Sequence, residues 1–340
     1  MVELLLKEME KLRRPSGAFI AAPSEEYNAC WLRDQLYISL AYYYLRDFQK
    51  LKQGIWVVFD ILKKYIHKIE QGICSCEFSL HAKYHPDTFE EITEHWGHHQ
   101  LDALGLLLYL TGYFNSKNIN LFRDKRDIRL IQLLVFYIQA VRYWEQGDFG
   151  MWENDFNVHS SSVGAVVAGF YWLEKNRIVT VPRCLIESGR EALRALLPNE
   201  TYERVVDMAL LSLIWPYNIV SEKDADVILT RVKEKLVQEH GLNRYIQDSY
   251  YCSGNGIPAE WPMGFFWLSI IASQRNDIKQ AEYWLNRGLE QKTPQGYIPE
   301  LYTDGSPNKN TPLAWAHSLA IIAHLKLHEQ RQKLAKNKRS

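Results

Sequence analysis

The sequence predicts an all-α protein of about twelve helices in a single domain. Apolar residues recur at helical spacing along most of the chain, as at Ile228, Val232 and Leu236. Alternating strand-like patterns are scarce, and we expect short hairpins at most near 75–85 and 244–251. No low-complexity linker or change in composition divides the 340 residues.

Start signals place individual helices along the chain. Ser221 and Asp224 form a capping-box pattern just before the apolar stripe that contains Ile228. Pro312 follows Asn310 and Thr311, at a first-turn position that a helix tolerates. The other helical stretches that we expect are 1–13, 31–48, 52–69, 99–114, 127–145, 159–175, 184–196, 199–214, 261–275, 277–290 and 312–330.

Helices of similar length that are joined by short loops pack as antiparallel pairs. About a dozen of them can close into a double ring, in which inner helices present residues to a central pocket and outer helices shield them. A solenoid of helical pairs would have the same helix count, but the sequence shows no fixed-period repeat. We assign 1–330 to this domain and 331–340 to a basic, solvated tail.

Composition narrows the classes of function. Lys and Arg number 40 and so do Asp and Glu, so neither nucleic acid nor an anionic membrane is an expected partner. No apolar run has membrane length, and the charged stretch 1–14 is not a signal peptide. The cysteines are irregularly spaced, with Cys74 and Cys76 too close for a CxxC pair. We therefore expect reduced thiols in a cytoplasmic protein.

Aromatic residues are the unusual component of the chain, with 11 Trp, 20 Tyr and 13 Phe. Core packing must account for most of them. Aromatic faces also stack on the apolar C–H faces of pyranose rings, so sugar binding is a second interpretation. Arg33 and Asp34 follow Trp31 at an expected helix start. They either cap the helix and pair with another charge, or bind adjacent sugar hydroxyls.

A cluster of histidines lies before another expected helix. His95, His98 and His99 precede Asp102 and raise the question of a metal site. The HEXXH pattern is absent, and the adjacent His98 and His99 would point to different helix faces. We expect no metal and no cofactor, and we interpret the segment around Trp96 as the aromatic and polar rim of a pocket.

Two glutamates, Glu153 and Glu300, each lie beside an aromatic residue in a glycine-containing loop before a helix. Cleavage of a glycosidic bond with inversion needs such a pair: one carboxylic acid protonates the leaving oxygen, and one carboxylate activates water on the opposite face of the sugar. The acid needs a pKa raised by burial against apolar groups, and the base must stay ionised. Trp152 beside Glu153 offers an apolar wall.

Five ordered segments together resemble glycoside hydrolase family 15, the glucoamylase family. These segments are GAFIAA with WLRD, WGHHQLDALG, MWEN, RYIQDSYYCSGNG, and YIPE with PLAWAHS. Other segments more closely resemble a divergent branch of the family, the homologous domain of the α and β regulatory subunits of phosphorylase kinase. They include LHAKYHPDT, HWGHHQLDALGLLLYL, DFGMWE and AEWPMGFFW. The resemblance covers residues 17–320.

The resemblance implies an (α/α)6 barrel with Glu153 as general acid and Glu300 as general base. It also implies a glucose-binding set that holds the non-reducing sugar. Our candidate substrate-binding residues are Arg33, Asp34, Trp96, Gln100, Asp102, Met151, Trp152, Asn154, Arg244 and Trp315. Asn154 departs from the family pattern, which has a second glutamate directly after the acid.

The expected function is an inverting α-glucoside hydrolase that releases glucose from the non-reducing end of small α-gluco-oligosaccharides. The alternative is a non-catalytic domain that binds a glucan or oligosaccharide, like the domain of the kinase subunits. Fold alone does not choose between the two, because one fold hosts many functions.

Overall fold

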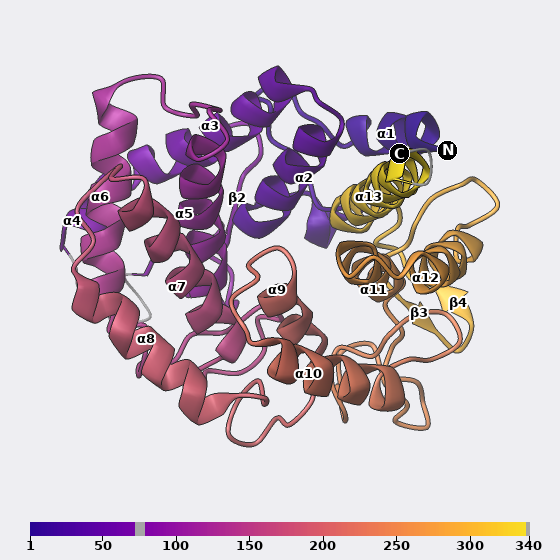
Figure 1. Cartoon of the computed structure of the whole chain (residues 1–340). Coiled ribbons are helices and arrows are strands. Elements are labelled where there is room, and N and C mark those ends of the chain that lie inside the picture. The colour runs from indigo at the N-terminus through magenta and orange to yellow at the C-terminus, as the bar shows by residue number, and fades with distance from the viewer. Residues whose placement is uncertain (72–78, 338–340) are drawn as a thin grey trace.

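The computed structural model describes residues 1–71 and 79–337. Its helices form two concentric rings, and this confirms the expected all-α (α/α)6 barrel (Figure 1). The inner ring consists of α2 (Leu32–Tyr44), α5 (Leu101–Asn115), α7 (Ser160–Lys175), the short α9 (Leu211–Ile214), α11 (Met263–Gln274) and α13 (Ala314–Asn337). The outer ring consists of α1 (Val2–Glu10), α3 (Phe48–Lys64), α6 (Lys125–Ala140), α8 (Arg183–Leu196), α10 (Glu222–Lys235) and α12 (Ile278–Glu290).

The remaining described elements are small. Helix α4 (Ile66–Gln71) follows α3, and two short antiparallel pairs join β1 (Cys30–Trp31) to β2 (Lys83–Tyr84) and β3 (Tyr302–Thr303) to β4 (Ser306–Pro307). The first pair places Trp31 opposite Lys83. It therefore joins the start of α2 to a segment about fifty residues further along the chain.

Burial separates the two rings as their sequences require. Along α11 nearly every residue is buried, and the same holds along α5. A helix that is apolar all round must be surrounded by protein. Helices α8 and α12 instead bury a single stripe and expose charged residues on the other side, which suits an outer position.

A cluster of aromatic rings fills the middle of the barrel. Tyr37 lies 5.1 Å from Trp315, 5.9 Å from Trp267 and 6.3 Å from Trp215, measured between ring centroids.

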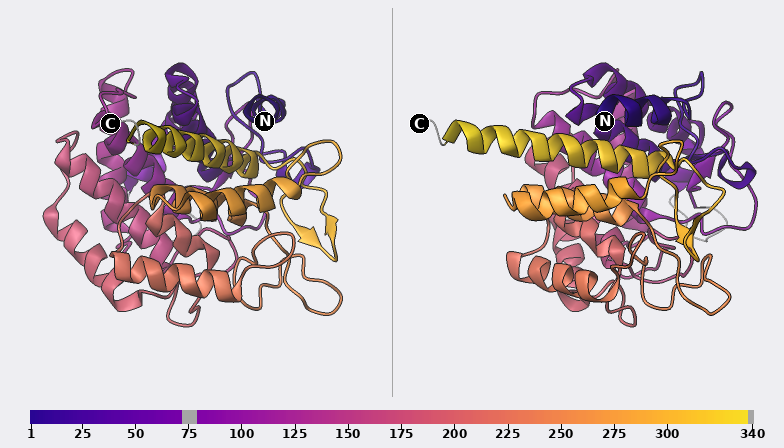
Figure 2. Two further views of the ribbon diagram at one scale, coloured as in Figure 1. Left: turned by 45° about the vertical axis from the view of Figure 1, so that its right-hand side comes forward. Right: turned by 90° about the vertical axis from the view of Figure 1, so that its right-hand side faces the viewer.

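The two ends of the barrel carry different structural elements. One end carries β3, β4 and long loops, and the C-terminus of α13 projects from the other (Figure 2).

Several local expectations need correction. The stretch 199–214 is helical only near its end, because the buried Asp207 accepts a hydrogen bond from the Ala209 amide and caps a late start. The stretch 52–69 is divided at Tyr65. The hairpin expected near 75–85 lies partly outside the described residues, and Lys83 and Tyr84 pair with β1. The stretch 244–251 contains turns and one isolated bridge, from Tyr245 to Asp207, instead of a hairpin.

Other local features agree with the sequence or extend it. Ser221 caps α10 by accepting a hydrogen bond from the Asp224 amide at 3.1 Å, as the capping box predicts. Helix α13 continues through the boundary that we expected at residue 330, so 331–337 belong to its last turns. Cys74 and Cys76 lie outside the described residues. No helix in the described ranges is long and apolar enough to cross a membrane.

Helices α5 and α7 touch through glycines, which yields the first prediction. A Cβ atom on Gly105 would lie 2.6 Å from the carbonyl carbon of Ala165, whereas one on Gly254 would meet no atom within 4 Å. Alanine normally stabilises a helix relative to glycine. We nevertheless expect Gly105→Ala to lower the free energy of unfolding by about 2 kcal/mol, because the two backbones must separate.

Urea denaturation of the Gly105→Ala variant checks this expectation. Gly254→Ala is the matched control and should leave the unfolding free energy nearly unchanged. A Gly105→Ala protein as stable as the parent would contradict the close packing of α5 on α7.

Candidate active site

A cavity opens at the end of the barrel where the inner helices α2, α11 and α13 begin. It is lined by Ala21, Tyr27, Trp31, Arg33, Asp34, Trp96, Met151, Trp152, Glu153, Arg244, Tyr250, Trp261, Glu300, Leu313 and Trp315. Both expected catalytic glutamates are in this set. Tryptophans supply much of the remaining wall.

Glu153 lies in a tight turn between α6 and α7. Its φ angle is +64°, in the left-handed region that non-glycine residues rarely adopt. Gly97 makes room for the turn, because a Cβ atom there would lie 2.5 Å from the Glu153 carbonyl oxygen. Backbone strain of this kind is often found at functional sites and persists only where the surroundings enforce it.

The turn that carries Glu153 is anchored by Asp148. The buried carboxylate of Asp148 accepts hydrogen bonds from the Leu101 amide at 2.8 Å and the Ser162 hydroxyl at 2.7 Å. His159 contacts the same carboxylate through Nδ1 at 3.0 Å. One carboxylate thus joins the starts of α5 and α7 to the turn between them.

The carboxylate of Glu153 is surrounded by donors. Arg33 donates from Nη2 to Oε1 at 2.8 Å, and Trp31 donates from its indole to Oε2 at 3.3 Å. The Trp96 indole also donates to Oε2. The carboxylate of Glu153 thus has a cation and two indole N–H groups as its hydrogen-bond donors.

Arg33 is buried and connects several of the expected residues. Its Nη1 donates to Gln100 Oε1 at 2.9 Å and to Asp102 Oδ2 at 3.0 Å. Gln100 and Asp102 therefore lie behind Arg33 and do not line the cavity. The structure places them as residues that orient Arg33, which itself reaches the cavity.

Lys83 contributes a second cation, which is not among the expected site residues. Its side chain is buried, with Nζ 3.7 Å from the ring centroid of Trp96 and 5.0 Å from that of Trp31. The ammonium also pairs with Glu94. A cation over an indole face is attracted by the electrons of the ring. Lys83 therefore helps to fix the two indoles that hold Glu153.

Glu300 has a different environment. It is 1% exposed and accepts hydrogen bonds from the Tyr27 hydroxyl at 2.6 Å, from Asn308 Nδ2 at 2.5 Å and from Asn310 Nδ2 at 2.7 Å. Burial raises the pKa of Glu300 above its ordinary value, while these donors and the charge of Arg244 lower it. Neutral donors thus hold this carboxylate, whereas Glu153 is held by an arginine.

Asp34 faces the cavity without a partner. Among the described residues, no side chain or amide hydrogen-bonds to its carboxylate, although only 6% of the residue is exposed. Burial raises the pKa of Asp34 to about 7, against the opposing charge of Arg33. An unsatisfied acceptor in a cavity wall is suited to a ligand that carries hydroxyl groups.

Arg244 also lines the cavity and is held by an ion pair. It donates from Nε and Nη2 to the two oxygens of Asp248, at 2.6 and 2.7 Å. Its guanidinium carbon lies 5.5 Å from the Trp152 ring and 5.0 Å from the Trp261 ring. A guanidinium that is held from one side keeps its remaining N–H groups available to a ligand.

The other expected residues divide into two groups. Met151, Trp152 and Trp315 line the cavity, and the Trp152 indole is fixed by a 2.7 Å bond to Asp207. Asn154 is exposed and does not line the cavity, and its amide donates to the Tyr245 hydroxyl.

The histidines do not gather around a shared point. The ring of His98 stacks on His81 at a centroid distance of 4.0 Å, and His99 is buried near Phe156. In the parts of the chain that the structure describes, no group of three or more possible ligands is placed to hold a metal ion.

Sequence reasoning did not select several residues of the site. Tyr27, Asn308 and Asn310 hold Glu300, and Lys83 lies behind the tryptophans. The Asn308–Asn310 pair lies eight and ten residues after Glu300, and this proximity was the available signal. Lys83 lies over Trp31 from a segment about fifty residues later in the chain, and no local pattern identifies that contact.

Comparison with known proteins assigns this arrangement to a family. A model described as "Glycosyl hydrolases family 15" matches residues 3–173, about half of the chain. The chain belongs to glycosyl hydrolase family 15. The resemblance that we inferred from the ordered motifs is therefore confirmed.

Two relatives show the kinds of protein that this family 15 chain resembles. The skeletal muscle isoform of phosphorylase b kinase regulatory subunit alpha from Oryctolagus cuniculus is 24% identical over 401 residues, which cover 92% of this chain and 31% of the relative. An uncharacterized glycosyl hydrolase from Methanocaldococcus jannaschii is 23% identical and covers 90% of this chain and 52% of its own. The chain thus spans about a third of the kinase subunit and half of the hydrolase.

Solved structures share the family 15 fold. A wild-type glycosidase superposes with a TM-score of 0.79 at 20% identity, and 96% of each chain is covered. A bacterial glucoamylase complexed with acarbose gives a TM-score of 0.70 at 16% identity, covering 96% of this chain and 55% of the other. These similarities establish the barrel fold. The activity is inferred from the residues of the site.

The unpartnered Asp34 yields a prediction on pH and stability. Between about pH 4 and 7 the folded protein keeps a proton on Asp34 that the unfolded chain has lost, because the pKa is raised to about 7. This residue therefore makes the fold less stable as pH rises through that window. We expect the stability of Asp34→Asn, relative to the parent, to increase by as much as about 1.4 kcal/mol per pH unit.

Urea denaturation at pH 5, 6, 7 and 8 measures this difference. Asp87→Asn, at an exposed aspartate, is the matched control and should show a constant difference from the parent. A constant difference for Asp34→Asn as well would mean that Asp34 titrates normally.

Proposed function

We propose that this protein hydrolyses small α-glucosides with inversion, with Glu153 as general acid and Glu300 as general base. The observation that carries the proposal is the cavity itself. It places two carboxylates among tryptophans and fixed arginines, and the two carboxylates have different hydrogen-bond partners. Two carboxyl groups with different environments are the requirement for acid and base roles at one pH.

The walls of the cavity support binding of one glucosyl unit. Asp34 offers a free acceptor for sugar hydroxyls, and Arg244 offers N–H groups that Asp248 leaves free. Trp96 and Trp315 provide apolar faces for the C–H groups of the ring. Such complementary groups around one small cavity suit the end of a chain better than its middle, which supports attack at the non-reducing end.

Glu300 is suited to act as the base. Tyr27, Asn308 and Asn310 orient both oxygens of its carboxylate with neutral donors. A pKa raised by burial makes the ionised group a stronger proton acceptor, provided that the working pH lies above it. Water held beside such a carboxylate would be activated on one face of the sugar.

Glu153 must hold a proton in order to act as the acid. Its Oε1 accepts a hydrogen bond from the Arg33 guanidinium, and a glucosyl unit in the cavity would compete for the same N–H groups. The acid role therefore requires that the Glu153 carboxyl group exchange this bond for one to the leaving oxygen of the glucoside.

The alternative function is a domain that binds a gluco-oligosaccharide without cleaving it. Two observations favour it: the Arg33–Glu153 ion pair, and the similarity to proteins named as regulatory subunits of phosphorylase b kinase. In this case the cavity would recognise a sugar end as a signal. The kinase subunits are longer, so their wider activities do not transfer with the shared region.

Removal of either carboxyl group tests the hydrolase proposal. We expect Glu300→Gln and Glu153→Gln each to lower turnover by about 10²- to 10⁴-fold, which is the usual contribution of a general acid or base. The assay measures glucose release from maltose, longer malto-oligosaccharides and nitrophenyl α-glucoside, and NMR identifies the anomer of the product.

Glu290→Gln, at an exposed glutamate on α12, is the control and should keep full activity. A Glu300→Gln protein with parental turnover would remove Glu300 from the mechanism. If the parent cleaves none of the panel but binds it in calorimetry, and Asp34→Ala loses that binding, the non-catalytic function replaces the hydrolase.

Tyr27 provides a prediction on the pH profile. Tyr27→Phe removes a donor to Glu300, so the pKa of that carboxyl should rise further above its ordinary value. The base must be ionised, so the acidic limb of kcat/KM should move to higher pH by about 1 unit. Tyr202→Phe, at an exposed tyrosine, is the control, and an unmoved limb in Tyr27→Phe would argue against Glu300 as the base.

A further inference from the structure

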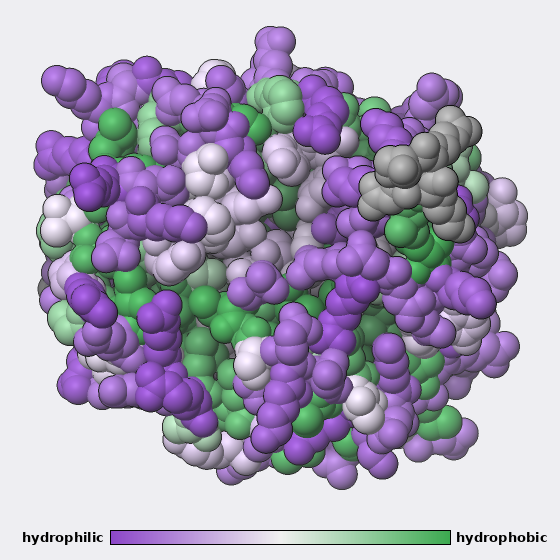
Figure 3. Space-filling view, viewed as in Figure 1, coloured by the Kyte–Doolittle hydropathy of each residue, from purple (hydrophilic) through white to green (hydrophobic). Residues whose placement is uncertain are grey.

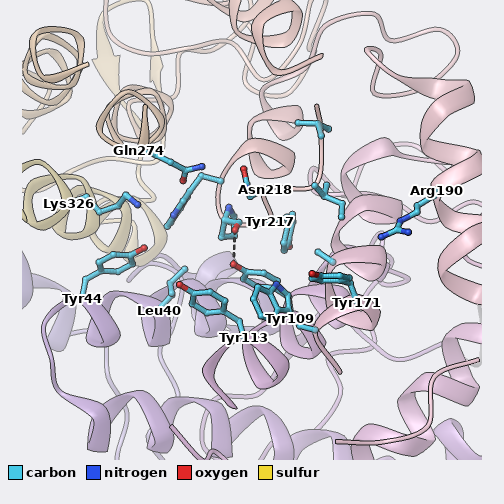
Figure 4. Close-up of a pocket in the computed structure, with 16 residues that line it drawn as sticks. Leu40, Tyr44, Tyr109, Tyr113, Tyr171, Arg190, Tyr217, Asn218, Gln274 and Lys326 are labelled. Atoms are coloured by element: carbon cyan, nitrogen blue, oxygen red, sulfur yellow. Dashed lines mark hydrogen bonds between the residues drawn. The ribbon is translucent and has the colours of Figure 1, made fainter. Parts of the chain in front are cut away.

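A second cavity lies at the opposite end of the barrel, where the inner helices α2, α5, α7 and α11 end (Figure 4). It measures about 710 Å³ and is larger than the candidate active site. Trp215 lines this cavity and Trp315 lines the candidate active site, and both rings pack against Tyr37. The aromatic centre of the barrel therefore separates the two cavities.

The wall of the second cavity is largely aromatic. Tyr109 stacks on Tyr113 at 5.4 Å with an interplanar angle of 11°, and Tyr217 meets Tyr109 edge-on at 5.2 Å. Trp172 adds a further ring, perpendicular to Tyr113 at 5.5 Å. These contacts hold the rings as one rigid surface. Figure 3 views this face and shows pale and green residues around its middle, among purple ones.

Hydrogen-bonding groups are spread over the same surface. The Tyr109 hydroxyl is bonded to the Pro216 carbonyl at 2.7 Å, whereas within the described residues the Tyr217 hydroxyl and the Asn218 side chain have no hydrogen-bond partner. A phenol both donates and accepts, and an amide does the same through separate atoms. A wall of this kind complements a ring with many hydroxyl groups better than a purine, which offers few.

The charges of the lining residues give a second indication of the kind of ligand. The described lining residues include the cations Lys326 and Arg190 and no carboxylate, and the two cations lie on opposite sides of the cavity (Figure 4). The Lys326 ammonium has no hydrogen-bond or ion-pair partner in the described ranges, and it lies 5.6 Å from the Tyr44 ring. Burial lowers the pKa of Lys326 to about 8, although Glu329 on the same helix opposes this. An unpaired, partly desolvated cation favours an anionic ligand group.

We infer that this cavity binds a phosphorylated pyranose, with the sugar ring on the tyrosine and tryptophan wall and the phosphate at Lys326. The aromatic surface accounts for the ring, the free hydroxyl and amide groups for the sugar hydroxyls, and the unpaired ammonium for the phosphate. The inference does not depend on hydrolysis at Glu153 and Glu300. A regulatory ligand and a substrate would then occupy opposite ends of one barrel.

Calorimetric titration of the full chain tests the inference with glucose 6-phosphate, glucose and inorganic phosphate as probes. We expect glucose 6-phosphate to bind at least tenfold more tightly than either part alone. Lys326→Met should weaken its binding tenfold or more, and Tyr217→Phe severalfold. Lys279→Met, at an exposed lysine on α12, is the charge-matched control and should bind like the parent.

Several outcomes would overturn the inference. No binding of glucose 6-phosphate at millimolar concentration would do so, as would equal binding of inorganic phosphate or tighter binding of adenosine monophosphate. Binding that survives Lys326→Met but is lost in Asp34→Ala would place the ligand in the other cavity. Glucoside hydrolysis by Lys326→Met is measured separately and should equal that of the parent, so failure here leaves the hydrolase proposal intact.

Discussion

The buried guanidinium of Arg33 is the contact on which the candidate active site depends. It bonds to Gln100 and Asp102 at the start of α5, and to Glu153 in the turn before α7. Three segments of the chain thus meet at one cation at the start of α2. An ion pair in such a place is costly to break, because the remaining charge is left without water. The position of each segment therefore depends on the other two.

A second cation contacts the two indoles that bind the same carboxylate. Lys83 reaches the site through β2, which pairs with β1, and its ammonium lies over the two indoles that donate to Glu153. Glu153 therefore has an arginine as its direct partner and a lysine behind the indoles that bind it. In the described part of the chain, the hydrogen-bond donors to Glu300 are neutral. This contrast is the electrostatic difference between the two carboxyl groups, and it arises from contacts that are distant in sequence.

Much of the fold could be predicted from the sequence, because helical periodicity and capping signals are local. Ser221 at the start of α10 is one example. The structure of the stretch 199–214 could not be predicted in this way. The buried Asp207 bonds to the backbone and to the Trp152 indole instead of lying on a helix face. Such competition between side chain and backbone depends on tertiary contacts.

The sequence predicted which residues lie near the candidate site, but it predicted less well which groups they contact. Motifs identified Glu153, Glu300 and Arg33, and all three line one cavity. Motifs did not distinguish residues that face the cavity from those behind it. Asp102 lies behind Arg33, and Asn154 is directed to Tyr245 at the surface. Sequence spacing defines which helix end carries a residue, but the direction of its side chain depends on how neighbouring segments pack.

The left-handed backbone at Glu153 has a consequence for the evolution of this chain. Only glycine adopts that conformation without cost, so a glutamate is kept there at the expense of about 1 kcal/mol or more of folding stability. Mutation to glycine would relieve that strain, but it would also remove one of the two carboxylate partners of the buried Arg33. The ion pair therefore opposes the drift to glycine that the backbone alone would favour, and it keeps a glutamate in this turn for a structural reason as well as a chemical one.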